Sequence, residues 1–142
     1  MYSKVLVPID GSENSFRALK HGLFLGSRLG AKLVVLYVLD TPPVPFVQSQ
    51  KVIDSVDKSF EKESKEVFTK VDSEAKNYDI DYETVLLKGH HIASLINEYA
   101  DQNDIDVIVI GSRGYGKVKT TILGSVSHDV SHHTKKPVLI IK

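Results

Sequence analysis

The sequence predicts an α/β protein in which helices cover both faces of a five-stranded parallel sheet. Two observations predict this class. Short runs of consecutive apolar residues, without polar alternation, are typical of strands that are buried on both faces of a parallel sheet. Segments with helical spacing of their apolar residues lie between these runs, and such alternation is the pattern of a parallel sheet. The predicted strands are Lys4–Ile9, Lys32–Leu39, Tyr82–Leu87, Asp106–Ile110 and Val138–Ile141.

The segments between the predicted strands have the features of helices. The first follows a turn at residues 10–12, with Ser12 as its N-cap, and Gly30 ends it. The proline-rich residues 41–50 are predicted to form a loop. The other predicted helices span about residues 51–77, 92–103 and 126–134.

The composition is that of an ordinary globular protein, with 42% hydrophobic and 25% charged residues. Its 142 residues are expected to form one domain, residues 1–142. Eighteen basic residues balance eighteen acidic ones, which gives no reason to expect nucleic acid or an anionic membrane as a partner. The absence of cysteine excludes disulfides, thiolate zinc sites and a cysteine nucleophile. The N-terminal apolar run is too short for a signal peptide or a membrane span, so a cytoplasmic location is expected.

The fourth predicted strand leads into a glycine-rich segment, GSRGYGKVKTTILGSVS, at residues 111–127. Its pattern is G-x2-G-x9-G-S, formed by Gly111, Gly114, Gly124 and Ser125. A strand that ends in a glycine turn and feeds the start of a helix can bind an anion, because backbone N–H groups converge there. Glycine is also common in ordinary surface loops, so the spacing alone leaves a phosphate site and a plain loop both open.

The same segment comes close to two known nucleotide motifs without matching either. Residues 111–117 read G-x4-G-K, but Val118 stands where the Walker A motif needs the Ser or Thr that holds magnesium. The glycines also do not have the G-x-G-x-x-G spacing of a dinucleotide fingerprint. Neither motif is therefore assigned.

Several unusual residues fall at the carboxyl ends of predicted strands. Asp10, Val38, Gly89 and Gly111 each lie at the carboxyl end of one of them. Ligands of open parallel sheets bind outside the carboxyl ends of the strands, where the strand order reverses. The sequence therefore predicts a ligand site at this edge of the sheet.

Polar residues near that edge are candidates for ligand contacts. Asp10 could bind magnesium or accept a hydrogen bond from a ribose hydroxyl. Arg113, Lys117 and Lys119 could neutralise phosphate charge, although the two lysines could equally be solvated loop residues. The pair His90–His91 could contact a ligand or be an ordinary polar pair at the start of a helix.

No catalytic or metal-binding residue is assigned. The sequence has no G-x-S-x-G elbow and no H-E-x-x-H pair. His128 and His132 are spaced for one helix face, but no carboxylate stands at a suitable third-ligand position.

With these residues in hand, the sequence resembles the universal stress protein family over essentially its whole length. The resemblance rests on the segments KVLVPIDGSENSFRAL, KLVVLYVL, DVIVIGSRG, LGSVS and KKPVLIIK. The G-x2-G-x9-G-S pattern resembles the ATP-binding branch of that family. The resemblance implies a Rossmann-like sandwich of the adenine nucleotide alpha hydrolase type, with strand order 3-2-1-4-5. It also implies a dimer through the last strand, and ATP as the ligand with or without a Mg or Mn ion.

The resemblance also implies which residues form the nucleotide site. Pro8, Ile9 and Asp10 would lie against the nucleoside, and Val38 would contact adenine through its backbone. The residues implied to hold ribose and phosphates are Ile110, Gly111, Gly114, Gly124, Ser125 and Val126.

Two positions depart from the usual family pattern. Arg113 stands where many members have histidine, which changes the phosphate partner but keeps a hydrogen-bond donor. His90 stands where members often have proline, so no local ligand contact is assigned to it.

The leading hypothesis is a cytoplasmic, ATP-binding regulatory protein of the stress response, in which ATP hydrolysis is weak or absent. One alternative is a slow ATPase or nucleotidyl transferase that uses Asp10 and a divalent ion. Another is a structural dimer without nucleotide. The dimer is predicted to form through Val138–Ile141, an edge strand without an inward charge to discourage pairing.

Overall fold

The computed structural model describes residues 1–41, 50–114 and 123–142, with the side chains of residues 50–56 left out. Most of the proline-rich segment, together with Lys117 and Lys119, lies outside the described residues. The elements are β1 (Lys4–Ile9), α1 (Glu13–Leu29), β2 (Lys32–Asp40), α2 (Gln50–Ala75), β3 (Tyr82–Gly89), α3 (Ile92–Gln102), β4 (Val107–Gly111), α4 (Ser125–His133) and β5 (Val138–Ile141).

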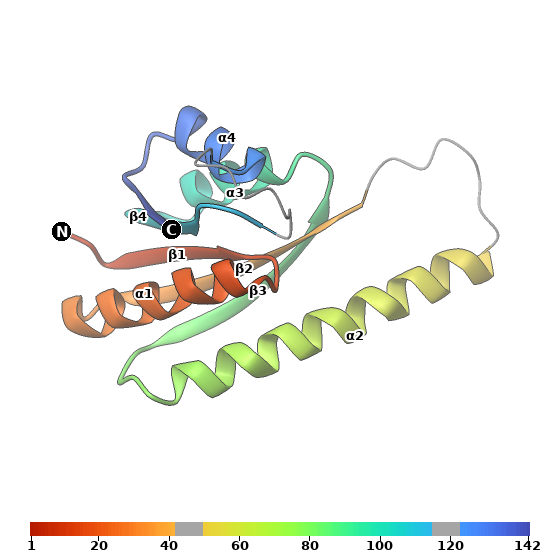
Figure 1. Ribbon diagram of the computed structural model, residues 1–142, viewed down its shortest axis with the longest axis horizontal. Coiled ribbons are helices and arrows are strands. Elements are labelled where there is room, and N and C mark those ends of the chain that lie inside the picture. The colour runs from red at the N-terminus through yellow and green to blue at the C-terminus, as the bar shows by residue number, and fades with distance from the viewer. Residues whose placement is uncertain (42–49, 115–122) are drawn as a thin grey trace.

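The strands form one parallel sheet of order β3-β2-β1-β4-β5, which confirms the predicted fold class and strand order (Figure 1). β1 is the central strand, and the chain moves from it first to one side and then to the other. β1 pairs with β2 only as far as Ile9 and Tyr37, whereas β2 continues beside β3 to Asp40 and Gly89. The sheet therefore has an opening at its carboxyl edge, where the strand order reverses.

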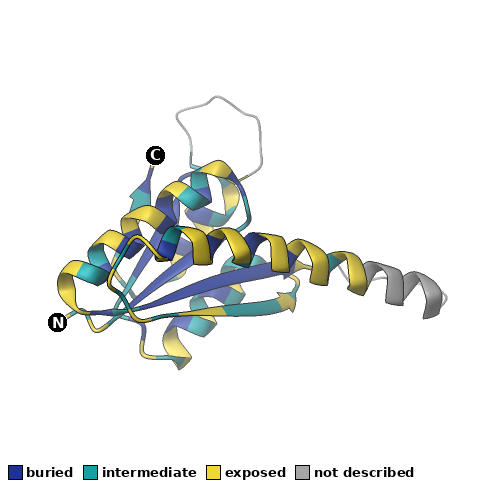
Figure 2. Ribbon diagram, turned by 90° about the horizontal axis from the view of Figure 1, so that it is seen from below, coloured by how far each residue is buried: buried dark blue, intermediate teal, exposed yellow. Residues whose placement is uncertain are grey.

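Strand residues alternate between two hydrophobic cores, one on each face of the sheet. Val5, Val7 and Ile9 of β1 pack on the face that α1 and α2 cover. Leu6 points to the opposite face, which α3 and α4 cover. Figure 2 shows the buried strands between these two helical layers. Burial on both faces explains why the central strands are continuous apolar runs.

Both ends of α1 have the capping residues that the sequence predicted. Ser12 is its N-cap, and the Ser12 hydroxyl accepts a hydrogen bond from the Ser15 N–H at 3.2 Å. Gly30 follows the helix in the left-handed region, at φ 64°, as a C-terminal glycine does. The predictions for β2 and β3 stopped short by one and two residues, because strand pairing extends them to Asp40 and Gly89.

Candidate functional site

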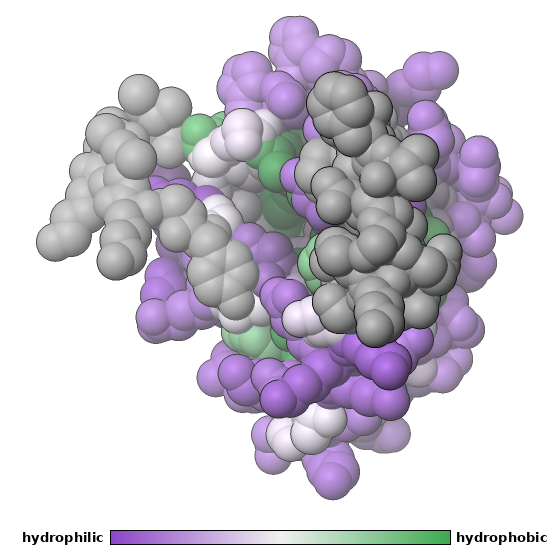
Figure 3. Space-filling model, turned by 90° about the vertical axis from the view of Figure 1, so that its right-hand side faces the viewer, coloured by the Kyte–Doolittle hydropathy of each residue, from purple (hydrophilic) through white to green (hydrophobic). Residues whose placement is uncertain are grey.

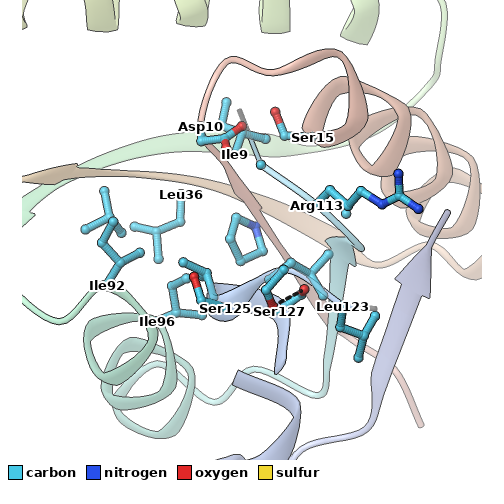
Figure 4. Close-up of a pocket in the computed structure, with 17 residues that line it drawn as sticks. Ile9, Asp10, Ser15, Leu36, Ile92, Ile96, Arg113, Leu123, Ser125 and Ser127 are labelled. Carbon is cyan, nitrogen blue, oxygen red and sulfur yellow. Dashed lines mark hydrogen bonds between the residues drawn. The ribbon is translucent and has the colours of Figure 1, made fainter. Parts of the chain in front are cut away.

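A cavity of about 580 Å³ opens at the carboxyl edge of the sheet, beside the end of β1. Figure 3 views the molecule from that side and shows a hollow with hydrophobic residues inside and hydrophilic residues around it. Figure 4 shows the side chains that line the cavity. This volume lies within the usual range for small-molecule sites.

Every residue of the predicted nucleotide site lines this one cavity. These residues are Pro8, Ile9, Asp10, Val38, Ile110, Gly111, Arg113, Gly114, Gly124, Ser125 and Val126. The described lining also includes residues that the sequence did not point to, namely Ser15, Leu36, Ile92, Ile96, Leu123 and Ser127. Leu36 could have been found, because it lies two residues before Val38 on the same face of β2.

One end of the cavity is apolar. Leu36 and Val38 reach it from β2, and Ile92 and Ile96 reach it from the first two turns of α3 (Figure 4). Ile96 and Leu36 are fully buried, with 1% and 0% exposure. Such a wall suits a flat hydrophobic group.

The other end is polar and begins with Asp10. The Asp10 carboxylate accepts a hydrogen bond from the Ser12 N–H at 2.9 Å, and Gly11 between them has a φ of 84°. This local turn fixes the carboxylate at the end of β1. A Cβ atom at Gly114 would come within 2.5 Å of Asp10 Oδ2, so only glycine fits there without displacing that carboxylate.

The start of α4 is tied to the end of β4 through the buried Ser112. The Ser112 carbonyl accepts hydrogen bonds from the Gly124 N–H at 2.7 Å and from the Ser127 hydroxyl at 2.9 Å. A Cβ atom at Gly124 would lie 3.3 Å from that carbonyl oxygen and 3.4 Å from Arg113 Cα. Gly124 was expected to be needed for close approach to phosphate. In the structure, the close approach of two backbone segments also leaves little room for a side chain there.

The first turn of α4 offers donors to the cavity. Among the described residues, no side chain caps this helix, so the N–H groups of Ser125 and Val126 are not taken up by a cap. The Ser125 side chain is exposed and faces the cavity (Figure 4). Unpaired N–H groups and the positive end of the helix dipole favour an anion here.

Asn14 on α1 holds the glycine turn in place, a role that sequence reasoning missed. Its Nδ2 group donates to the Arg113 carbonyl at 3.1 Å and lies 3.3 Å from Ser112 Oγ. A Cβ atom at Gly111 would lie 3.0 Å from the Asn14 carbonyl oxygen. α1 therefore packs directly against the end of β4, which sequence spacing alone does not reveal.

The histidine candidates lie outside the main cavity. His90 and His91 line a smaller neighbouring cavity, together with His133 of α4. His128 and His132 have parallel rings with centroids 5.9 Å apart. Within residues 1–41, 50–114 and 123–142, no group of three or more His, Cys, Asp or Glu could hold a metal ion.

The strand order 3-2-1-4-5, with a cavity at the carboxyl edge of the central strand, places the chain among the adenine nucleotide alpha hydrolase-like folds. Within this class, the chain belongs to the universal stress protein family, whose family model matches residues 1–142. In the described part of the chain, no helix is long and apolar enough to cross a membrane.

Two curated relatives support this assignment along the whole chain. The universal stress protein YxiE of Bacillus subtilis is 31% identical over 149 residues, which cover 100% of both chains. The universal stress protein MJ0531 of Methanocaldococcus jannaschii is 29% identical over 142 residues, which cover 100% of this chain and 83% of that protein.

Solved structures agree in fold. UspA from Lactobacillus plantarum has a TM-score of 0.89 at 23% identity, covering 99% of this chain and 98% of that one. A universal stress protein in complex with cAMP has a TM-score of 0.72 at 25% identity, and the match covers 99% of this chain and 97% of that one. The universal stress protein from Archaeoglobus fulgidus in complex with dAMP has a TM-score of 0.68 at 25% identity, and the match covers 100% of this chain and 98% of that one. Relatives of this chain thus bind adenine nucleotides.

Proposed function

We propose that this chain is an ATP-binding, cytoplasmic regulatory protein of the stress response, with ATP held in the cavity at the carboxyl edge of the sheet. One observation carries the proposal. The complete G-x2-G-x9-G-S set lines the same cavity as Asp10 and the apolar wall. The cAMP and dAMP complexes of relatives support the ligand class. The finer choice of ATP rests on the polar end of the cavity.

The adenine ring is assigned to the apolar end, against Leu36, Val38, Ile92 and Ile96. In the described part of the chain, β2 pairs with β1 only as far as Tyr37, and we assign the Val38 backbone just beyond this point to the polar edge of the base. A planar base gains contact with aliphatic side chains on burial, and backbone groups read its polar edge.

The sugar and phosphates are assigned to the polar end. Asp10 is a fixed acceptor for a ribose hydroxyl. The first turn of α4 supplies N–H donors for phosphates, and the glycine turn at residues 111–114 lies beside it, joined to it by the hydrogen bond from the Gly124 N–H to the Ser112 carbonyl. Arg113 lines the same end and adds positive charge. Helix-start donors together with a cation suit a chain of phosphates better than a single one.

Calorimetric titration with ATP, AMP, cAMP, dAMP and GTP tests the proposal. We expect ATP to bind at least about tenfold more tightly than AMP, because the added phosphates meet charge-assisted donors. Equal affinity for ATP and AMP would refute the phosphate assignment, and no binding of any adenine nucleotide would refute the function. Incubation with radiolabelled ATP separates a regulatory protein, in which label stays on ATP, from the alternative of a slow ATPase.

We further propose that two copies of the chain associate through β5. This strand is an edge of the sheet, and Leu139 on it is 39% exposed. Pairing of β5 with its copy would cover both the free backbone edge and this side chain. Sedimentation at micromolar concentration should show a dimer, and Leu139→Lys should shift it toward monomer. A wild-type chain that sediments as a monomer would refute this association.

A further inference from the structure

A second cavity, of about 310 Å³, adjoins the proposed ATP site. It lies between the start of α3 and one side of α4, and Ile92, Ser125 and Val126 belong to the walls of both cavities. Any charge in the second cavity therefore acts on a ligand in the first across a single layer of side chains.

Three imidazoles and two carboxylates line this second cavity. They are His90, His91, His133, Asp40 and Asp129. With the imidazoles neutral, the lining carries a formal charge of −2 from the two carboxylates. With all three imidazoles protonated, the same lining carries +1, because three positive charges are added to −2. Imidazole is the side chain whose charge ordinarily changes between pH 5 and pH 8.

The two histidines at the β3–α3 junction are placed to respond together. His90 Nδ1 lies 3.3 Å from Asp40 Oδ1, an ion pair when the imidazole is protonated. The centroids of the His90 and His91 rings lie 4.3 Å apart. His91 is held in the left-handed region at φ 62°, and the next residue, Ile92, lines both cavities.

The α4 side of the cavity contributes His133 and Asp129. His133 Nδ1 lies 2.9 Å from the Asp129 carbonyl oxygen, which leaves Nε2 to take up a proton. The Asp129 carboxylate lies 3.1 Å from His128 Nδ1. Lys88, near the end of β3, pairs instead with Asp57 of α2 at 3.8 Å, so it does not neutralise the cavity.

From this placement we propose that nucleotide binding is coupled to proton uptake by His90, His91 and His133. Protonation turns the neighbouring cavity from negative to positive, which attracts the anionic ligand across the shared wall. By linkage, a bound nucleotide favours the protonated imidazoles in return. The chain would then hold nucleotide more tightly as the surroundings become acidic. This inference rests on the proposed ATP site and adds a regulation to it.

The test is calorimetric titration of ATP at pH 8.0 and pH 5.5, with circular dichroism as the folding control at each pH. We compare the wild type with a triple variant, His90→Gln, His91→Asn and His133→Gln. Asparagine is chosen at residue 91 because it tolerates the left-handed region. The variant is needed because phosphate groups themselves titrate near pH 6. His21→Gln, on α1 at the other face of the sheet, is the matched control.

We expect the wild type and His21→Gln to gain about tenfold more ATP affinity than the triple variant on this acidification, as charges separated by one side-chain layer allow. Titrations of the wild type in buffers of different ionisation enthalpy should also show net proton uptake on binding. This measurement and the exposed single variant His133→Gln decide the matter even if the triple variant fails to fold. ATP binding with the same pH dependence in all variants would overturn the coupling alone. Absence of ATP binding at both pH values would overturn the proposed function as well.

Discussion

The two ends of the main cavity are built in different ways. The polar end consists of turns and a helix start, held by hydrogen bonds that the Asn14 side chain, the Gly124 N–H and the Ser127 hydroxyl donate. The apolar end consists of side chains that are at the same time part of a hydrophobic core, among them Leu36 and Ile96. A change at the polar end should therefore act mainly on ligand affinity, whereas a change at the apolar end should act mainly on folding.

The strongest test of this contrast is Gly124→Asp. The new Cβ atom would press on the Ser112 carbonyl, only 3.3 Å away, and the carboxylate would face the proposed phosphate position. Repulsion between like charges at contact costs up to about 4 kcal/mol near a protein surface, so affinity for ATP should fall by up to nearly a thousandfold. Titration of a fluorescent ATP analogue measures this. A folded Gly124→Asp protein with unchanged affinity would place the ligand elsewhere.

At the apolar end, Ile96→Ala should act mainly on the free energy of unfolding rather than on ligand affinity. Ile96 is 1% exposed and packs in the core under α3, so its truncation should lower the free energy of unfolding by about 2–5 kcal/mol. Urea denaturation measures this loss. The matched variant Ile92→Ala removes a partly buried side chain from the same wall and should cost less. A loss at Ile96 of less than about 1 kcal/mol would show that this wall does not belong to the core.

Ser125→Ala returns to the polar end with a smaller change. It removes one hydroxyl donor to the proposed phosphates and leaves the backbone donors in place, which should cost roughly 1.5–3 kcal/mol of binding. That corresponds to a loss of about ten- to a hundredfold in ATP affinity. Ser131→Ala, on the same helix but outside the cavity lining, is the control and should bind as the wild type does. A stability loss without an affinity loss at Ser125 would contradict the contrast.

The same contrast explains what the sequence could and could not predict. Which residues line the polar end was predictable, because glycine spacing and a helix start can be read along the chain, whereas their binding of phosphate stays a prediction. Ile92 and Ile96 could not be recognised as lining residues, because an amphipathic helix shows which face is apolar but not which turn borders a cavity. Asn14 was missed for a related reason, since its hydrogen bonds join α1 to a segment about a hundred residues later.

The fold was predictable to a greater extent than the site. β1 and β5 have the predicted bounds, and the strand order follows the predicted one. The ends of β2 and β3 differed because pairing between strands, rather than local sequence, sets where a strand stops. The reason for glycine at residue 124 also needed coordinates, since a contact between two backbones leaves no mark on the sequence.

The smallest expected effect concerns Asp106, which precedes β4 at the opposite edge of the sheet and so lies away from both ends of the cavity. Hydrogen bonds from the Lys4 N–H, the Ser3 N–H and the Ser3 hydroxyl lower the pKa of Asp106 below its usual value. The ionised carboxylate therefore stabilises the fold above about pH 4, the pKa of an unfolded aspartate, and this contribution is lost as pH falls through the lower folded value.

Because water screens the group, Asp106→Asn should cost less than about 1 kcal/mol at pH 7. Urea denaturation should show this difference in the free energy of unfolding at pH 7 and a smaller difference toward pH 3. The affinity for ATP should stay unchanged, because Asp106 precedes β4 and the cavity lies beyond the other end of that strand. A difference that persists undiminished at pH 3, or an altered ATP affinity, would mean that Asp106 acts through contacts other than its charge.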